Sequence, residues 1–374
     1  MGGSRFGFGL LGPLLMTVAG TPIALGTPKQ RAVLALLLIN RNRAVGPESL
    51  VNAAWDQSPA PAVRASIHSY VSNLRRILRS AEVDPHAVLA SAPPGYRLNV
   101  TEGDCDLDRF ITKKTAGIHA AAAGQFEQAS SHLSEALAEW RGPVLDDLRD
   151  FAFVQVFATA LMEDNVSAHT ARAEAEIACG RGYAVIGELE ELAAGHPYHE
   201  PLWAQLITAY YVTERQSNAL EAYRRLKTVL AEELGIDPGP TVESLHMRIL
   251  RQQRLDTKQV AKTTAARTLT TAHSAFVRNP AVAGLRDAAG RRYPLQAPET
   301  RMGRLADNDI VLDDAEVSRH HAVIIDTGSS FMITDLRSAN GVLLQGRRLR
   351  PSATLADGDH ISICGHEFTF EIRP

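Results

Sequence analysis

The sequence predicts a multidomain α plus β protein with a mixed α/β head, an all-helical middle and a β-sandwich tail. Its 374 residues suffice for two to three domains. The hydrophobic period changes from helical to alternating near Leu285, which marks the start of a strand-rich region. We expect a head at 1–103, a helical middle at 104–251, a linker at 252–281 and a β domain at 282–374.

Charge is distributed unevenly along the chain. Residues 1–100 contain 10 Lys and Arg against 4 Asp and Glu, whereas residues 101–251 contain 13 against 24. Residues 252–374 contain 16 against 14. A basic head beside an acidic middle indicates that the head, rather than the whole chain, meets a polyanion.

Composition argues against an exported or membrane protein. Cys105, Cys179 and Cys364 lie far apart and form no CxxC pair, which favours a reduced chain in the cytoplasm. The longest apolar run, Ala32–Ile39, is too short to span a bilayer. Residues 7–20 could pass for a weak signal peptide, but a turn at Ala19-Gly20 between the apolar segments 10–18 and 21–25 favours a β-hairpin.

Three helices are predicted after this hairpin. Thr27 suits an N-cap, Pro28 the first helical position, and Gln30 stands three residues after the cap, so a helix should run from there to about residues 40–42. A short helix follows at 47–55, and the segment 56–61 breaks it. The third helix, at about 62–79, has one apolar stripe formed by Ile67, Val71, Leu74 and Leu78.

The opposite face of the third helix is polar and basic and holds no acidic residue. It is formed by Arg64, Ser66, Ser69, Asn73, Arg75, Arg76 and Arg79. Two short strands in residues 88–100 flank Pro93-Pro94-Gly95 and place Arg97 near the tip of a small hairpin. Such a face suits a phosphate backbone, although a solvated face of a domain that binds no DNA is the alternative.

Residues 5–100 resemble the winged helix-turn-helix of the OmpR type, through "TPKQRAVLALLL", "ASIHSYVSNLRRIL" and "PPGYRL". The resemblance implies that double-stranded promoter DNA is a partner and that the third helix enters the major groove. Ser69 and Asn73 are then candidates for base edges, and Arg75, Arg76 and Arg97 for phosphates. Asn73 stands where many members of this class carry another arginine.

The middle is predicted to be tetratricopeptide-like. Its helical pattern breaks at Ala123-Gly124, and turns at Gly180 and Glu214 lie 34 residues apart, the tetratricopeptide period. The segments "WRGPVLDDL" and "LAEELGIDPGP" resemble the bacterial transcriptional activation domain of the SARP class of activators. This resemblance implies contacts with RNA polymerase or self-association, whereas helices that merely pack on the head are the alternative.

Residues 252–281 are poor in apolar side chains and rich in Thr, Ala, Lys and Arg, which predicts a tether that could be helical in part. Five threonines in this basic context are candidate kinase targets, although ordinary linker composition also explains them. They are Thr263, Thr264, Thr268, Thr270 and Thr271.

The tail alternates apolar and polar residues in several short segments. Phe368, Phe370 and Ile372 fall on one side of residues 367–372. Further strands are expected at "DIVLD", "HAVIID", "FMITDL", "GVLLQ" and "HISIC", separated by turns at 326–328, 340–341, 345–346 and 357–358. The pattern predicts a β-sandwich.

The stretch "VSRHHAVI" at 317–324 could suggest a nucleophile with a base, or a metal site. Adjacent residues of a strand point to opposite faces, so His320 and His321 cannot both ligate one metal directly. No third ligand has a zinc-like spacing, and a nucleophile elbow is missing. We therefore expect no catalytic residue, no metal and no cofactor.

The tail resembles the forkhead-associated (FHA) domain, with Gly303-Arg304, Ser318-x-x-His321 and Asn340-Gly341 in the right order and spacing. The resemblance implies a phosphothreonine peptide as ligand. Arg304, Ser318 and Arg319 would bind the phosphate, and Asn340 the peptide backbone. Gly303, His321 and Gly341 would have structural roles, His321 by a hydrogen bond to the Ser318 loop, and His320 is expected to be exposed.

The order of the three domains resembles the EmbR-type regulators of mycobacteria over essentially the whole chain. The resemblance implies a DNA-binding transcriptional regulator controlled by a phosphorylated Ser/Thr protein kinase that docks on the FHA domain. The alternative is an interaction protein that binds the kinase as a modulator or competitor without productive DNA binding.

Overall fold

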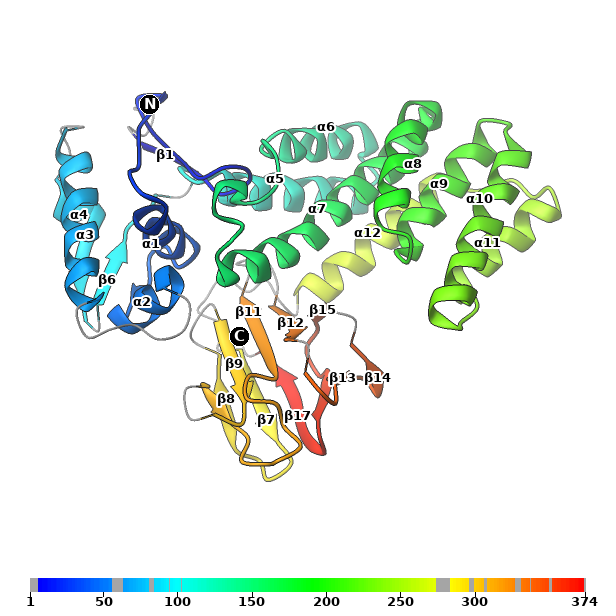
Figure 1. Ribbon diagram of the computed structural model, residues 1–374. Helices are drawn as coiled ribbons and strands as arrows, with labels where there is room; N and C mark the ends of the chain where they lie inside the picture. The colour runs from blue at the N-terminus through cyan, green and yellow to red at the C-terminus, as the bar shows by residue number, and fades with distance from the viewer. Residues whose placement is uncertain are drawn as a thin grey trace. The chain divides into compact units, whose positions relative to one another are not determined.

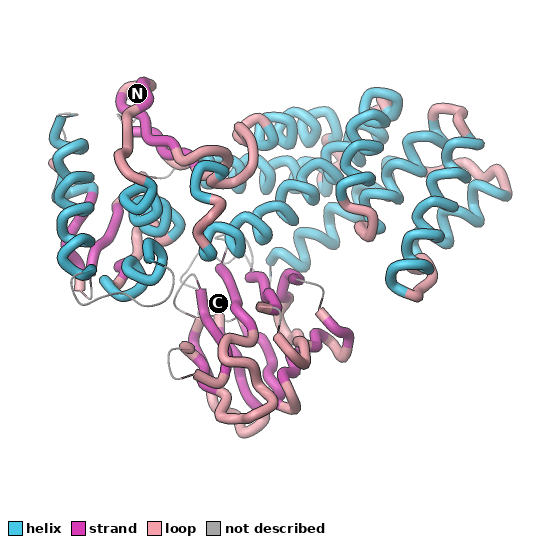
Figure 2. Tube along the Cα trace, viewed as in Figure 1, coloured by secondary structure: helices cyan, strands magenta, loops and turns pink. Residues whose placement is uncertain are grey.

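The computed structural model describes residues 6–55, 63–80, 84–93, 95–101, 103–273, 283–295, 299–305, 308–326, 331–336, 338–349 and 352–372. The chain divides into two compact units. The first contains residues 1–109, 139–162 and 271–374, and the second contains residues 110–138 and 163–270. Helices fill the middle of the chain, whereas strands belong to its head and tail (Figure 1, Figure 2).

The head contains two small antiparallel sheets and three main helices. One sheet has the strand order β1-β2-β3 and the other β4-β6-β5. The elements are β1 (Phe6–Gly9), β2 (Leu15–Val18), β3 (Thr21–Pro22), α1 (Pro28–Ile39), β4 (Ala44–Val45), α2 (Pro47–Trp55), α3 (Val63–Ser80), α4 (Pro85–Val88), β5 (Leu89–Ala92) and β6 (Gly95–Leu98).

The helices of the head begin and end where the local sequence predicts. Thr27 caps α1, because its side chain accepts a hydrogen bond from Gln30 N at 3.4 Å. Asn40 forms the C-cap, and α2 and α3 agree with the predicted helices to within one residue. The predicted breaker segment at 56–61 lies outside the described residues. The stripe of α3 is buried at all four positions, Ile67, Val71, Leu74 and Leu78.

The first strand segment departs from the prediction. Ala19 and Gly20 have φ values of 47° and 80° and form the expected turn between β2 and β3. Residues 10–18, however, are not one strand, since the chain turns between β1 and β2 and these two strands pair with each other. Gly12, with a φ of 148°, permits this turn, which the apolar pattern alone did not reveal.

The middle is helical throughout, as predicted. Gly180 and Glu214, the two expected turn residues, both have positive φ, 81° and 64°. Trp203 and Tyr210 lie in the core of this region. The elements are α5 (Asp106–Ala122), α6 (Phe126–Leu137), η1 (Asp146–Leu148), α7 (Ala152–Ala178), η2 (Gly182–Val185), α8 (Ile186–Gly195), α9 (Glu200–Val212), α10 (Gln216–Val229), η3 (Leu230–Leu234) and α11 (Pro240–Leu250).

The segment expected to be a linker contains a packed helix, α12 (Thr257–His273). Ala265 joins a small buried cluster with residues of α5, α6 and α7. Beside it, Glu174 of α7 is only 8% exposed and accepts a hydrogen bond from Gln205 Nε2 at 3.5 Å. Burial raises the pKa of Glu174 to about 7. The side chains of Thr270 and Thr271 lie outside the described residues.

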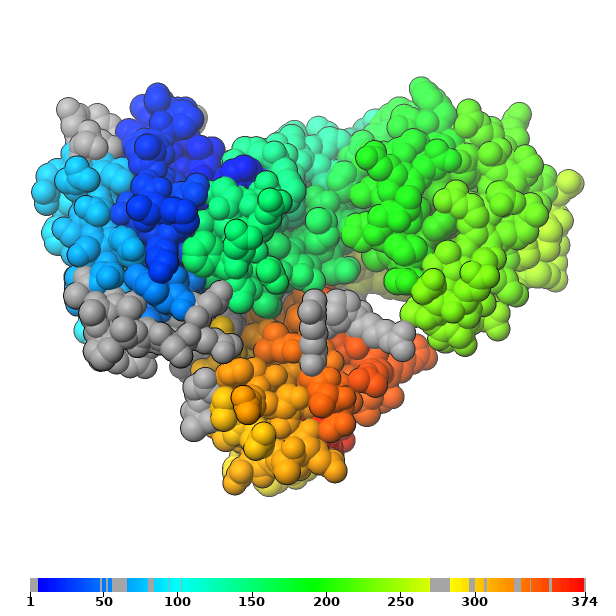
Figure 3. All heavy atoms as spheres, viewed as in Figure 1, coloured from blue at the N-terminus to red at the C-terminus, as the bar shows by residue number. Residues whose placement is uncertain are grey.

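The tail is a β-sandwich of two sheets, with strand orders β10-β9-β11-β12-β15 and β14-β13-β16-β17-β7-β8. Side chains from both sheets, among them Ile324, Ile333, Phe368 and Phe370, form one core. In Figure 3 the tail is the compact body coloured from yellow to red. The strands are β7 (Gly284–Asp287), β8 (Arg292–Pro294), β9 (Glu299–Gly303), β10 (Ile310–Val311), β11 (Ala322–Asp326), β12 (Phe331–Asp335), β13 (Leu343–Leu344), β14 (Arg347–Arg348), β15 (Ser352–Leu355), β16 (His360–Ile363) and β17 (His366–Glu371).

Every segment of the tail that was predicted as a strand contains one. Positive φ values at Gly341, Gln345, Gly346 and Gly358 agree with three of the expected turns. Residues 327–328 of the fourth lie outside the described part of the chain. Within the described residues, no helix combines the length and apolar character that crossing a bilayer requires.

Candidate functional site

Two loops at one end of the sandwich lie side by side and carry the motif residues. Arg304 N donates to Ser318 O at 3.0 Å, and Leu305 N donates to Arg319 O at 3.2 Å. Gly303 stands where the loops touch, since a Cβ there would lie 2.4 Å from Arg319 O. A larger residue at Gly303 would therefore separate the two loops.

His321 connects the Ser318 loop to a third loop, which carries Asn340. Its side chain is fully buried. Nδ1 accepts a hydrogen bond from Ser318 N at 3.0 Å, and Nε2 lies 3.1 Å from Gly341 O. Since Nδ1 accepts, Nε2 carries the hydrogen and donates to Gly341 O. The expected hydrogen bond between His321 and the Ser318 loop is thus present. His321 also makes a second hydrogen bond, to Gly341 O of the Asn340 loop.

Ser318 and Asn340 are brought together by this arrangement. Ser318 Oγ accepts a hydrogen bond from Ala339 N at 3.0 Å, which leaves its own O–H able to donate to a ligand. Asn340 Nδ2 donates to Glu316 O at 2.9 Å, so both side chains help to join the two loops. Gly341, with a φ of 78°, lets the chain turn directly after Asn340.

The two predicted phosphate-binding arginines are exposed. Arg304 uses Nε to donate to Val317 O at 3.3 Å. Its terminal nitrogens have no partner among the residues that the structure describes, and neither has the guanidinium of Arg319. Two guanidinium groups on these adjoining loops therefore remain able to bind an anion.

Asn308 is a structural residue of the site that the sequence did not reveal. Its side chain is buried, and Nδ2 donates to both Leu305 O at 2.8 Å and Arg319 O at 2.9 Å. Its Oδ1 lies 3.2 Å from Nδ1 of His320. The expectation that His320 is simply exposed was wrong, because its half-buried ring contacts this asparagine.

The candidate DNA-binding residues of the head differ in their surroundings. Ser69, Arg76 and Arg97 are exposed, and Ser66 is half-buried. Asn73 Nδ2 donates to Gln30 Oε1 of α1 at 3.3 Å. The side chain of Arg64 lies outside the described residues.

Arg75 of α3 is hydrogen-bonded to the β5–β6 hairpin, which we call the wing. Its Nε and Nη2 donate to Leu89 O at 3.0 and 2.8 Å, and Nη2 also donates to Ser91 Oγ at 3.0 Å. The guanidinium lies 5.7 Å from the ring centre of Tyr96. Arg75 therefore has a structural role in positioning β5, in addition to any contact that it makes with DNA.

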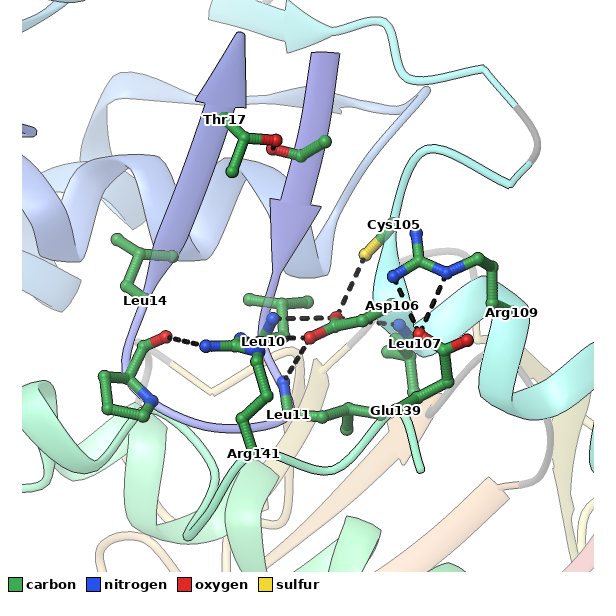
Figure 4. Close-up of polar contacts among 12 residues, drawn as sticks. Leu10, Leu11, Leu14, Thr17, Cys105, Asp106, Leu107, Arg109, Glu139 and Arg141 are labelled. Atoms are coloured by element: carbon green, nitrogen blue, oxygen red, sulfur yellow. Dashed lines mark hydrogen bonds and ion pairs between the residues drawn. The ribbon is translucent and has the colours of Figure 1, made fainter. Parts of the chain in front are cut away.

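A buried carboxylate joins the N-terminal sheet to the start of α5 (Figure 4). Asp106 accepts hydrogen bonds from Leu10 N and Leu107 N at 2.8 Å and from Leu11 N at 3.0 Å. Arg141 Nη2 pairs with the same carboxylate at 3.1 Å. Beside it, burial raises the pKa of the Cys105 thiol to about 12, so this cysteine stays protonated. We call Asp106 and these partners the Asp106 clamp.

Asp147 makes a second connection of this kind. It accepts from Leu14 N at 2.7 Å and pairs with Arg31 of α1 at 2.6 Å. The contacts of Asp106 with Leu10 and Leu11, and those of Asp147 with Leu14 and Arg31, join residues about a hundred positions or more apart. No local sequence pattern could therefore predict them.

Comparison with protein families gives three matches. Residues 20–98 match the family described as transcriptional regulatory protein, C terminal, residues 105–250 match the bacterial transcriptional activator domain, and residues 300–364 match the FHA domain.

Several curated proteins are similar to this chain. The transcriptional regulatory protein EmbR of Mycobacterium tuberculosis is 66% identical over 98% of this chain and 96% of its own. MoaR1 of the same species is 53% identical over 67% of this chain and 80% of its own. A solved structure of Mycobacterium tuberculosis EmbR in complex with a low-affinity phosphopeptide has a TM-score of 0.96 and covers 99% of this chain and 98% of its own.

Proposed function

Because the chain belongs to the EmbR family of transcriptional regulators, we propose that it binds promoter DNA under the control of a Ser/Thr protein kinase. In this proposal a phosphothreonine of the kinase binds the FHA domain of this chain. The observation that supports it best is the convergence of Arg304, Ser318 and Asn340 on one end of the sandwich, with His321 between the loops.

The chemistry of the three groups suits a phosphothreonine. Its phosphate carries about 1.5 to 2 negative charges and three acceptor oxygens near neutral pH. The planar guanidinium of Arg304 offers paired donors, and the Ser318 hydroxyl offers one more. The Asn340 side chain has both a donor and an acceptor, which matches the peptide groups next to the phosphothreonine.

The DNA-binding half of the proposal depends on the head. We infer that α3 enters the major groove while Arg76 and Arg97 contact phosphates. Docking would bring the kinase close enough to phosphorylate this chain, and that modification would alter DNA binding or a contact of the acidic middle with RNA polymerase.

Binding of a phosphorylated kinase to two variants tests the phosphothreonine half. Arg304→Ala and Asn340→Ala should each weaken binding by roughly tenfold or more, since each removes hydrogen bonds to a charged or desolvated ligand. Arg291→Ala is the matched control, because Arg291 is also exposed but pairs with Asp287 in the turn between β7 and β8. Unchanged affinity in both site variants would refute this half.

A second candidate function follows from the internal partners of two predicted DNA contacts. Asn73 is hydrogen-bonded to Gln30, and Arg75 to the wing, so neither side chain is fully available for DNA. These contacts favour a kinase-binding modulator without productive DNA recognition. A mobility-shift assay with promoter fragments at several salt concentrations, with and without kinase, separates the two. A sequence-specific shift supports the regulator, and its absence under all conditions supports the modulator.

A further inference from the structure

A third arginine lies next to the candidate phosphothreonine site. Strands β13 and β14 form a two-residue hairpin through Gln345 and Gly346, and β14 is the edge strand of its sheet (Figure 1). Arg348 of β14 faces Leu343 in the register, but its guanidinium reaches back along the hairpin to Gly341. A Cβ on Gly341 would lie 2.7 Å from Nε and 3.0 Å from both Cζ and Nη2 of Arg348.

This contact places a positive charge beside Asn340. Gly341 directly follows Asn340, and neighbouring Cα atoms are about 3.8 Å apart. The guanidinium lies against the backbone at Gly341, in space that a side chain at that position would occupy.

No acidic group neutralises this charge among the described residues. Arg348 is exposed and has no ion-pair or hydrogen-bond partner in the described part of the chain. Asp359, which contacts the same hairpin, accepts from Gln345 Nε2 at 2.7 Å and from Ala356 N at 2.8 Å. Asp314 pairs with His366 at 3.4 Å. The positive charge of Arg348 is therefore directed at solvent or at a ligand.

We propose that Arg348 is a specificity-determining residue that binds a second anionic group of the phosphothreonine peptide. An extended peptide advances about 3.3 Å per residue, so the second group would lie within about three residues of the phosphothreonine. A carboxylate of Asp or Glu and a second phosphorylated residue offer the same chemistry, oxygen acceptors with negative charge. The inference rests on the proposed phosphothreonine recognition by Arg304, Ser318 and Asn340, which it extends to the neighbouring sequence.

Fluorescence anisotropy with the full chain and labelled peptides tests the proposal. One peptide carries a single phosphothreonine in an alanine background. Others add Glu, or a second phosphothreonine, at each of the three positions on either side. We expect the wild-type chain to bind one Glu peptide about fivefold to tenfold more tightly than the alanine peptide, and the corresponding doubly phosphorylated peptide more tightly still.

Arg348→Ala should abolish this gain while binding the alanine-background peptide within about twofold of wild type. Arg348→Lys should keep part of the gain, because it keeps the charge but not the planar fork. Arg347→Ala, which removes the neighbouring exposed arginine of the same strand, is the control and should keep the full gain.

The possible failures are distinguishable. Phosphate-dependent binding of the alanine peptide without any preference for a second anion refutes the role of Arg348 alone. So does a gain that survives in Arg348→Ala. Equal affinity for phosphorylated and unphosphorylated peptides refutes the proposed function and, with it, this inference.

Discussion

The substitution His321→Ala tests whether one buried ring holds the site together. His321 links the Ser318 loop to the Asn340 loop through two hydrogen bonds, to Ser318 N and Gly341 O. The substitution would leave a partly buried N–H and a buried carbonyl without these partners. Each unsatisfied group costs about 1–3 kcal/mol, so the joined state of the loops should lose about 3 kcal/mol.

Hydrogen exchange of the full chain measures this loss directly. A cost of about 3 kcal/mol corresponds to roughly hundredfold faster exchange of amides that the joined loops protect. The effect should appear in peptides covering 316–321 and 338–342. Affinity for a phosphothreonine peptide should fall at least about tenfold, because the ligand must then also order the loops.

His320→Ala provides the control for His321→Ala. His320 is half-buried and its ring contacts Asn308, so its removal should perturb the site by less than about 1 kcal/mol. If exchange in both loops is the same in His321→Ala as in wild type, His321 does not join them and the reasoning fails.

Three further predictions concern the other parts of the chain. Folding raises the pKa of Glu174 from 4.5 to about 7, so its stabilising contribution is complete below about pH 4.5 and is lost as pH rises to about 7. Glu174→Gln should therefore stabilise the helical middle by about 3 kcal/mol at pH 8 but little at pH 4.5, as measured by urea unfolding with far-UV circular dichroism. Asp106→Ala leaves three backbone N–H groups without their acceptor, and the amides of Leu10 and Leu11 should exchange at least a hundredfold faster, an effect of about 3 kcal/mol. Arg76→Ala should weaken DNA binding and lower the salt slope by about one without affecting stability, whereas Arg75→Ala should increase exchange in the wing.

Matched substitutions of exposed acidic residues serve as controls for the changes at Glu174 and Asp106. Glu191→Gln changes an exposed glutamate of the same region, and an equal pH effect there would contradict the assignment to Glu174. Asp150→Ala removes an exposed aspartate and should leave Leu10 and Leu11 protected, unlike Asp106→Ala. An unchanged wing in Arg75→Ala would mean that its contacts to Leu89 and Ser91 do not hold β5.

Local signals predicted much of the fold. The cap at Thr27, the apolar stripe of α3 and the turns at Gly180 and Glu214 depend on neighbours within a few residues, so the sequence shows them directly. The two-residue strands β10, β13 and β14 are too short to show a period of their own. β10 and β13 were predicted because turn residues or the FHA motifs flank them, whereas β14 was not predicted.

Contacts between distant residues were not predictable. The Asp106 clamp joins groups that are 95 and 96 positions apart, and an aspartate that opens a helix looks like an ordinary capping residue. Helix α12 was missed as a packed element because two alanines, Ala261 and Ala265, provide its buried contacts instead of a stripe of large apolar side chains. The position of Arg348 on Gly341 depends on a hairpin that brings the two residues together in space.

Calorimetric titration of the full chain with a Ser/Thr kinase domain, once autophosphorylated and once dephosphorylated, tests whether phosphothreonine recognition joins the kinase to this chain. We predict saturable binding of the phosphorylated kinase domain and loss of that binding after phosphatase treatment. Equal affinity for the two forms would contradict phosphothreonine recognition as the link between the kinase and this regulator.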